Sequence, residues 1–359
     1  MIGCTNSMQI KDILFIFVFL AFALNYIGTN STILFVVSLL AILPLAAKMG
    51  EATEELAKIY GGHIGGLLNA TFGNAAELII ALLAINKGLL DLVKASIAGS
   101  IIGNILFVLG LSLLLGGLKY KEQKFSKHLA GLNATMLLIA FMSIMIPSLF
   151  HLMPDQVRNP KDELGLSIIV SILLISLYLL SILFSLKTHS HLFTSHSHKS
   201  HEDEKPKWSR NKAILVLLIS TVFLALISEI FVAQIETFAK SFNLTELFIG
   251  AVIVAIVGNA AEHISAVSFA MKNELDVAIG ITVGSSLQIA LFVAPVAVLA
   301  GIVMKQPMDL VFTPFEIIAV FASVLIVNEI SSDESTNWFE GAQLVIMYLI
   351  IAVLFYFVK

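Results

Sequence analysis

The sequence of 359 residues is poor in cysteine and in charge. Because Cys4 is the only cysteine, neither an intrachain disulfide nor a cysteine-rich metal centre can form. Charged residues make up 13% of the chain, whereas soluble domains carry about a quarter. No polar stretch is long enough for a separate soluble domain. The scarcity of charge therefore excludes an ordinary soluble protein, and the net charge of −4 says little about partners.

Hydrophobic residues make up 58% of the chain, and the mean hydropathy is +0.95. Apolar runs of about 17 to 25 residues have the length of a helix that crosses a bilayer. We therefore expect an all-α integral membrane protein with 11 transmembrane helices. The predicted helices are 13–27, 32–49, 64–85, 92–115, 129–149, 164–186, 213–238, 247–271, 277–304, 310–327 and 339–358. The first run lacks the flanks and cleavage site of a signal peptide.

The distribution of lysine and arginine predicts the orientation in the membrane. If the N-terminus is cytoplasmic, 14 of the 21 basic residues fall on the cytoplasmic side. This bias follows the positive-inside rule and places the C-terminus outside. Short loops without targeting extensions favour a prokaryotic plasma membrane.

The string Gly-Asn-Ala-Ala-Glu occurs twice inside apolar segments, at 73–77 and at 258–262. A carboxylate at bilayer depth costs roughly 2.5 to 3.5 kcal/mol on insertion scales, so such residues normally mark ion or proton pathways. A structural ion pair is the usual alternative. We expect Glu77 and Glu262 to lie on a transport pathway.

The repeat extends beyond this string. Residues 65–116 align without a gap onto residues 250–301 at an offset of 185 (262 − 77), with 19 of 52 positions identical. The two glutamates lie in the third and eighth predicted helices, and this odd separation makes the two copies enter the membrane from opposite sides. Inverted repeats are typical of secondary transporters. We expect an extra N-terminal helix (1–30), a first five-helix repeat (31–187), a cytoplasmic His-rich and acidic linker (188–212) and a second five-helix repeat (213–359).

Polar residues near each glutamate follow helical spacing. Each signature asparagine precedes its glutamate by three positions, so amide and carboxylate share one helix face. The next helix of each half adds further polar side chains. The candidate cation- and proton-binding residues are Glu77, Glu262, Asn74, Asn259, Ser100, Ser285, Gln288 and Asn104. Such an oxygen set suits a hard cation such as Ca²⁺. Helix packing is the alternative for the serines, and interhelical hydrogen bonding for Asn104 and Gln288.

Three further features are candidates for supporting roles. His263 follows Glu262 and points about 100° away around the helix, which leaves open a proton relay, a tuning role or no contact with the ion. Glu229 lies within a predicted gate helix and either assists ions and protons or is a cavity-facing structural acid. The histidines of 188–212 either bind metal or sense pH, or belong to a solvated linker.

Several stretches resemble the signatures of the calcium/proton exchangers, the CAX branch of the cation/calcium exchanger superfamily. They are residues 65–79 and 257–263 with, in addition, 52–57 and 337–341. The resemblance implies one helix plus two inverted five-helix halves and antiport of cytosolic Ca²⁺ for protons. It further implies Glu77 and Glu262 as ligands, completed by Asn74, Asn259, Ser100, Ser285 and Gln288. The signatures of this chain contain Ala-Glu where those of the sodium-coupled branch contain Pro-Glu, and this difference favours coupling to protons over coupling to sodium.

Exchange by alternating access follows from the charge of the two carboxylates. When Ca²⁺ or protons are bound, the site is nearly neutral, whereas the empty site with both carboxylates ionised is too costly to carry past the low-dielectric barrier.

The expected partners are Ca²⁺, protons and the lipid bilayer. No nucleic acid or cofactor is expected, and the formation of a homo-oligomer is left open. The alternative is a sodium- or potassium-coupled exchanger of calcium or another divalent cation. An intramembrane metalloprotease is disfavoured because no His-Glu-x-x-His motif is present.

Overall fold

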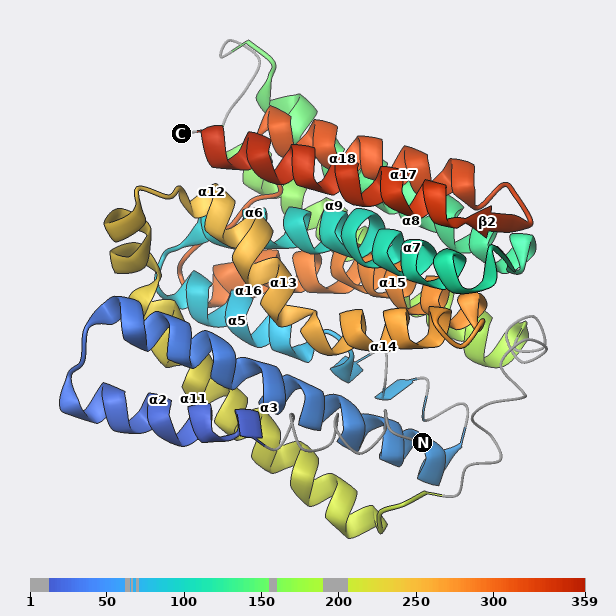
Figure 1. Cartoon of the computed structure of the whole chain (residues 1–359). Helices are drawn as coiled ribbons and strands as arrows, with labels where there is room; N and C mark the ends of the chain where they lie inside the picture. Colours follow the sequence, from blue (N-terminus) through green and yellow to red (C-terminus); the bar gives the residue numbers. More distant parts are fainter. Residues whose placement is uncertain are drawn as a thin grey trace.

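The computed structural model describes residues 13–61, 65, 67–68, 71–154, 160–189 and 206–358. The protein is predominantly helical, and most helices run side by side in a bundle (Figure 1). Each predicted apolar run overlaps a helix. The elements are α2 (Ile16–Ile27), α3 (Ser31–Tyr60), α5 (Ala75–Asn86), α6 (Leu90–Ile102), η1 (Gly103–Val108), α7 (Leu109–Tyr120), β1 (Glu122–Lys124), α8 (Lys127–His151), α9 (Pro160–Leu183), η2 (Phe184–Thr188), α11 (Arg210–Phe242), α12 (Glu246–Phe248), η3 (Ile249–Val254), α13 (Ala255–Gly258), α14 (Ala260–Ala270), α15 (Leu275–Gln288), η4 (Ile289–Val293), α16 (Ala294–Val303), α17 (Pro314–Ile330), β2 (Ser335–Asn337) and α18 (Trp338–Phe357).

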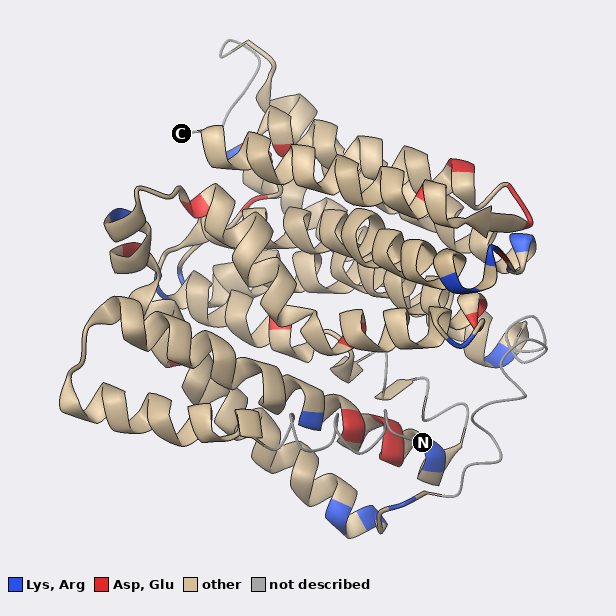
Figure 2. Ribbon diagram, in the orientation of Figure 1, with Lys and Arg blue, Asp and Glu red and all other residues tan. Residues whose placement is uncertain are grey.

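The helices have the dimensions of a multi-pass membrane protein. Seven of those described are long and apolar enough to cross a bilayer, and the bent pair Glu246–Gly258 and Ala260–Ala270 makes an eighth if it counts as one span. The apolar helices α2 and α5 are shorter. Charged residues gather mostly at the two ends of the bundle (Figure 2). The count of 11 crossings therefore stays a prediction.

Helices α2, α3 and α11 lie together along one side of the bundle (Figure 1). Near one end of α3, the ring of Phe35 stacks on Phe238 of α11 with centroids 3.8 Å apart. Near the other end, the carboxylate of Glu55 accepts hydrogen bonds from the backbone N–H groups of Lys207 and Trp208, at 2.6 and 2.9 Å. Helices α3 and α11 are thus joined at both ends. Residues 190–205 of the predicted His-rich linker lie outside the described residues.

Helical structure is interrupted at the asparagine of each repeated string. The segments before and after Asn259 differ in direction by 61°, and Asn259 itself has φ −92° and ψ 6°. Asn74 has φ −104° and ψ 29°, also outside the helical region. Each asparagine directly precedes a new helix, α5 or α14, so the glutamate three residues later lies in a first helical turn.

The sequence did not predict a short antiparallel sheet that joins distant segments of this predominantly helical protein. Strands β1 and β2 pair with Gln123 opposite Thr336. Three polar residues are too few for an alternating apolar pattern to reveal a strand. A side chain on Gly117 would overlap the backbone at Trp338, so β2 and the start of α18 sit directly against the end of α7.

Candidate ion-binding site

The two repeated glutamates occupy equivalent positions in two different helices. Glu77 and Glu262 are the third residues of α5 and α14. Helix N-termini carry partial positive charge, which favours a nearby carboxylate. Glu77 is 8% exposed, and within the described part of the chain neither of its carboxylate oxygens has a hydrogen-bond partner. The same holds for Oε2 of Glu262. Buried acceptors without partners are rare in folded proteins and call for a ligand or a proton.

The first glutamate packs directly against the second signature. A side chain added to Gly258 would place its Cβ 3.0 Å from Oε1 of Glu77. The carboxylates of Glu77 and Glu262 are also close enough to repel each other electrostatically. The glycine that begins the second string therefore leaves room for the glutamate of the first.

The amide and hydroxyl candidates form one connected network between the two halves. Asn74 Nδ2 donates to Gln288 Oε1 at 2.7 Å, and Ser285 Oγ donates to Asn74 Oδ1 at 2.8 Å. Asn104 Nδ2 donates to Ser285 Oγ at 3.1 Å and approaches Asn259 Oδ1 at 3.4 Å. The remaining contacts are Asn259 Nδ2 to Ser100 Oγ at 3.0 Å, Asn259 Nδ2 to the Ala255 carbonyl at 2.9 Å, and His263 Nε2 to Asn104 Oδ1 at 3.2 Å.

The structure thus brings together all the neutral candidates and His263. The hydroxyl of Ser285 lies near the carboxylate of Glu262, so the network extends toward the glutamates. Glu229 does not join it and is exposed on α11. Sequence reasoning missed two members, the carbonyl of Ala255 and the contact of Gly258 with Glu77. The repetition of the glycine in both strings was a signal for the second of these.

Two of the polar residues lie at π-helical turns. Asn104 is the second residue of η1, and Gln288 is the last residue before η4. A π turn adds a residue to the helical ring and occurs frequently at functional sites. In each half the π segment begins within one turn of the serine, three residues after Ser100 and four residues after Ser285.

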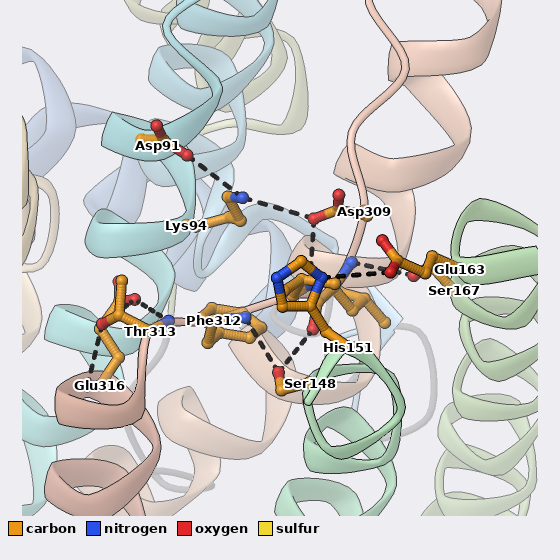
Figure 3. A network of polar contacts seen from close by, with 12 residues as sticks. Asp91, Lys94, Ser148, His151, Glu163, Ser167, Asp309, Phe312, Thr313 and Glu316 are labelled. Carbon is orange, nitrogen blue, oxygen red and sulfur yellow. Dashed lines mark hydrogen bonds and ion pairs between the residues drawn. The ribbon is translucent and has the colours of Figure 1, made fainter. Parts of the chain in front are cut away.

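A separate polar network lies at the start of α6 (Figure 3). Lys94 forms ion pairs with Asp91 at 3.2 Å and with Asp309 at 3.3 Å. Ser148 and Ser167 hold the extended segment before α17 through its backbone at Leu310 and Phe312. Lys94 lies within a predicted membrane helix, and its two carboxylate partners belong to this network and not to the glutamate pair.

The combined donor set consists of two carboxylates, four amides and two hydroxyls. These oxygens can coordinate a hard cation, and the two carboxylates can neutralise a divalent one or take up protons instead. Among the described residues, no three His, Cys, Asp or Glu side chains converge in the manner of a metal centre. The arrangement therefore differs from histidine- or cysteine-rich transition-metal sites.

The chain is similar to known membrane exchangers. A family profile described as sodium/calcium exchanger protein matches residues 30–187 and 212–357. The chain is 44% identical to a Ca²⁺/H⁺ antiporter of Synechocystis sp. over 98% of both chains. It is 46% identical to the Ca²⁺/H⁺ antiporter ChaA of Bacillus subtilis, over 96% of this chain and 99% of the relative.

Solved structures agree with this similarity. The structure of native YfkE superposes with a TM-score of 0.82 at 42% identity and covers 96% of this chain and 99% of that one. A crystal structure of an H⁺/Ca²⁺ exchanger, CAX, superposes with a TM-score of 0.72 at 13% identity over 98% of this chain and 92% of that one. At that identity the likeness concerns the fold alone.

Proposed function

The chain belongs to the sodium/calcium exchanger protein family, and we propose that it is a secondary antiporter that exchanges cytosolic Ca²⁺ for protons. The single observation that carries the proposal is the pair Glu77 and Glu262, the first buried and the second partly buried, each the third residue of one of two equivalent helices. The relatives described as Ca²⁺/H⁺ antiporters support the choice of ions. A transporter, and not an enzyme, fits both.

The mechanism follows from the charge of the pair. Ionised Glu77 and Glu262 bind Ca²⁺, and protons displace the ion by neutralising the carboxylates. Either load leaves the site nearly neutral, whereas the empty dianion is too costly to move through the low-dielectric interior. Exchange is therefore obligatory. Asn74, Asn259, Ser100, Ser285, Gln288 and Asn104 would supply neutral oxygens around the ion.

The repeat supports an architecture in which both halves contribute to one site by alternating access. In this proposal residues 1–30 form an extra helix, 31–187 and 213–359 form inverted five-helix halves, and 188–212 link them in the cytoplasm. The 11 crossings then place the N-terminus in the cytoplasm and the C-terminus outside a prokaryotic plasma membrane. Helices α3 and α11, which pack against each other along much of their length, would be the moving gate. Glu229 would face a different path from the glutamate pair, because it is exposed on α11.

The experiment is Ca²⁺ uptake into proteoliposomes with an imposed pH gradient or an imposed sodium gradient. We expect the wild type to respond to the pH gradient alone, and Glu77→Gln or Glu262→Gln to fall to the level of protein-free vesicles. Glu236→Gln is the matched control, because Glu236 is an exposed residue paired with Lys240 at 3.5 Å. Full uptake by either glutamine variant would overturn the proposal.

A second candidate is coupling to sodium or potassium, with calcium or another divalent cation as cargo. It is favoured by the name of the matching family and by the shared fold of the sodium-calcium exchanger NCX_Mj, which superposes with a TM-score of 0.55 at 16% identity. Uptake that requires a sodium or potassium gradient and ignores the pH gradient would establish it.

A further inference from the structure

The direction of the hydrogen-bonded network can be fixed from a backbone group. Asn259 Nδ2 lies 2.9 Å from the carbonyl oxygen of Ala255, which can only accept. The amide nitrogen of Asn259 must therefore face that carbonyl. Its Oδ1 then faces Asn104 of the first half and Ser285 of its own half.

Asn104 has one satisfactory orientation as a result. Its amide lies 3.4 Å from Asn259 Oδ1 and 3.1 Å from Ser285 Oγ, and the first of these atoms is an acceptor. Asn104 must present its nitrogen to this side, so its Oδ1 points at Nε2 of His263, 3.2 Å away. Amide and histidine orientations are assigned from such networks. An oxygen at this distance requires that Nε2 of His263 carry a hydrogen.

The remaining members follow the same direction. Ser285 donates to Asn74 Oδ1, and Asn74 donates to Gln288 Oε1. The donors thus run from His263 through Asn104, Ser285 and Asn74 to Gln288. Turning Asn104 over would set two acceptor oxygens face to face, which leaves buried polar groups unpaired at about 1–3 kcal/mol each.

The pair of His263 and Asn104 has no counterpart in the repeat. At the offset of 185, His263 matches Leu78 and Asn104 matches Ile289, both apolar. The ring of His263 is also held on its other side by Phe107, edge to face with centroids 6.5 Å apart. The hydrogen bond between His263 and Asn104 is therefore an asymmetric addition to the contacts that Asn104 makes with Asn259 and Ser285.

We infer that His263 is a positioning residue, an Nε2–H donor that orients Asn104. Asn104 in turn holds the oxygens of Asn259 and Ser285 in place within the site. Without a hydrogen on Nε2, Asn104 Oδ1 would face a bare nitrogen. The inference rests on the proposed antiport for its transport readout.

The test compares His263→Gln, whose amide can donate a hydrogen bond but cannot exchange protons near neutral pH, with His263→Leu and Asn104→Leu. We expect His263→Gln to keep the wild-type KM for Ca²⁺ and the wild-type pH profile of kcat. Each leucine variant should raise KM roughly fivefold, the factor for one hydrogen bond of about 1 kcal/mol. The double leucine variant should be no worse than the more affected single one. His128→Gln, at an exposed histidine of α8, is the control.

Three results would overturn the inference. One is a His263→Gln variant with the kinetics of His263→Leu, another is a pH profile that shifts in His263→Gln, and the third is an unchanged KM in His263→Leu. Folding is checked by monodisperse elution in detergent. If the wild type fails to antiport, the proposed function falls, and binding of radiolabelled Ca²⁺ to the same purified variants still tests the role of His263.

Discussion

The helices that carry Glu77 and Glu262 begin alike and end differently. Both start after a non-helical asparagine. The last carbonyls of α14, at Ala270 and Met271, accept hydrogen bonds from three side chains of the first half: Gln123 at 2.9 Å, Lys119 at 2.7 Å and Tyr120 at 3.2 Å. Around α5, where every residue is described, no second-half side chain donates to the last carbonyls. The repeat therefore places two glutamates at equivalent positions of two unequally anchored helices.

The difference comes from the connectors that follow each repeat. Within residues 121–126, strand β1 pairs with β2, and the backbone N–H of Ser126 donates to Asp276 at 2.6 Å. The equivalent residues 306–311 run without pairing as a strand and are held by Ser148, Ser167 and Lys94 (Figure 3). At the offset of 185, the three side chains that cap α14 correspond to Met304, Lys305 and Met308. The sequence similarity between the two repeats thus does not include the residues that hold the end of α14.

The largest expected difference between the two halves concerns two glycines at equivalent positions of the repeat, Gly99 and Gly284. A side chain on Gly99 would overlap the backbone of Ala251, whereas nothing lies within 4 Å of the same point on Gly284. We expect Gly99→Ala to destabilise the protein by more than the roughly 1–3 kcal/mol of an over-packed core, since the obstacle is backbone. Gly284→Ala should retain near wild-type stability. Thermal unfolding in detergent, followed by the fraction that elutes as a single peak, measures both. Equal losses in the two variants would contradict the unequal packing of the halves.

The next effect concerns the anchor of α14. Gln123 is 1% exposed and bonds to both the Ala270 carbonyl and Asn273 Oδ1. Gln123→Leu removes both hydrogen bonds and should cost about 1–3 kcal/mol, at about 0.5–1.5 kcal/mol for each bond, while the Ala270 carbonyl keeps the backbone N–H of Asn273 as a donor. The control is Met308→Leu at the equivalent position, a volume-conserving change expected to cost less than about 1.5 kcal/mol. Chemical denaturation monitored by fluorescence of the two tryptophans measures the difference. A larger loss of unfolding free energy in Met308→Leu than in Gln123→Leu would show that the hydrogen bonds of Gln123 do not stabilise the end of α14.

The sequence predicts the helices and the equivalent positions of the repeated residues because these depend on local signals. Apolar runs report helices, and the repeated strings bring Asn74, Asn259 and the glutamates into equivalent positions. The spacing of Ser100 and Ser285 from them then predicts which faces meet. In the structure the asparagines and serines among these residues belong to one hydrogen-bonded network.

Other features could not be predicted because they depend on contacts between the halves. The contacts of Asn104 depend on the π turn of η1, for which the sequence has no marker. A carboxylate in the middle of a helix does not reveal which face it occupies, so Glu229 remained a candidate although it lies exposed on α11. The apolar run that was expected to begin at 310 is extended until Thr313, whose side chain forms a capping box with Glu316.

A smaller effect on stability is expected in the connector before α17, where serine hydroxyls bond to the backbone in place of strand pairing. Ser148 accepts from the N–H of Phe312 at 2.9 Å and donates to the carbonyl of Leu310 at 3.1 Å. Ser148→Ala should cost about 1–2 kcal/mol, because both backbone groups are buried. Ser143→Ala on the same helix removes only a bond to its own helical carbonyl and should be nearly neutral. Thermal unfolding of the two variants decides whether the connector needs this hydroxyl.

The smallest effect should come from the exposed member of the α14 anchor. Lys119 Nζ donates to the carbonyl of Met271 at the helix C-terminus, where a positive charge is favourable. Because the side chain is exposed, Lys119→Met should cost only about 0.3–1 kcal/mol, and salt should screen part of it. Lys124→Met, at an exposed position of β1, is the control for loss of a positive charge. A difference between the two variants that shrinks as salt rises would identify the helix terminus as the partner. A difference that ignores salt would assign the effect to the hydrogen bond alone, and no difference would leave Gln123 and Tyr120 as the groups that anchor α14.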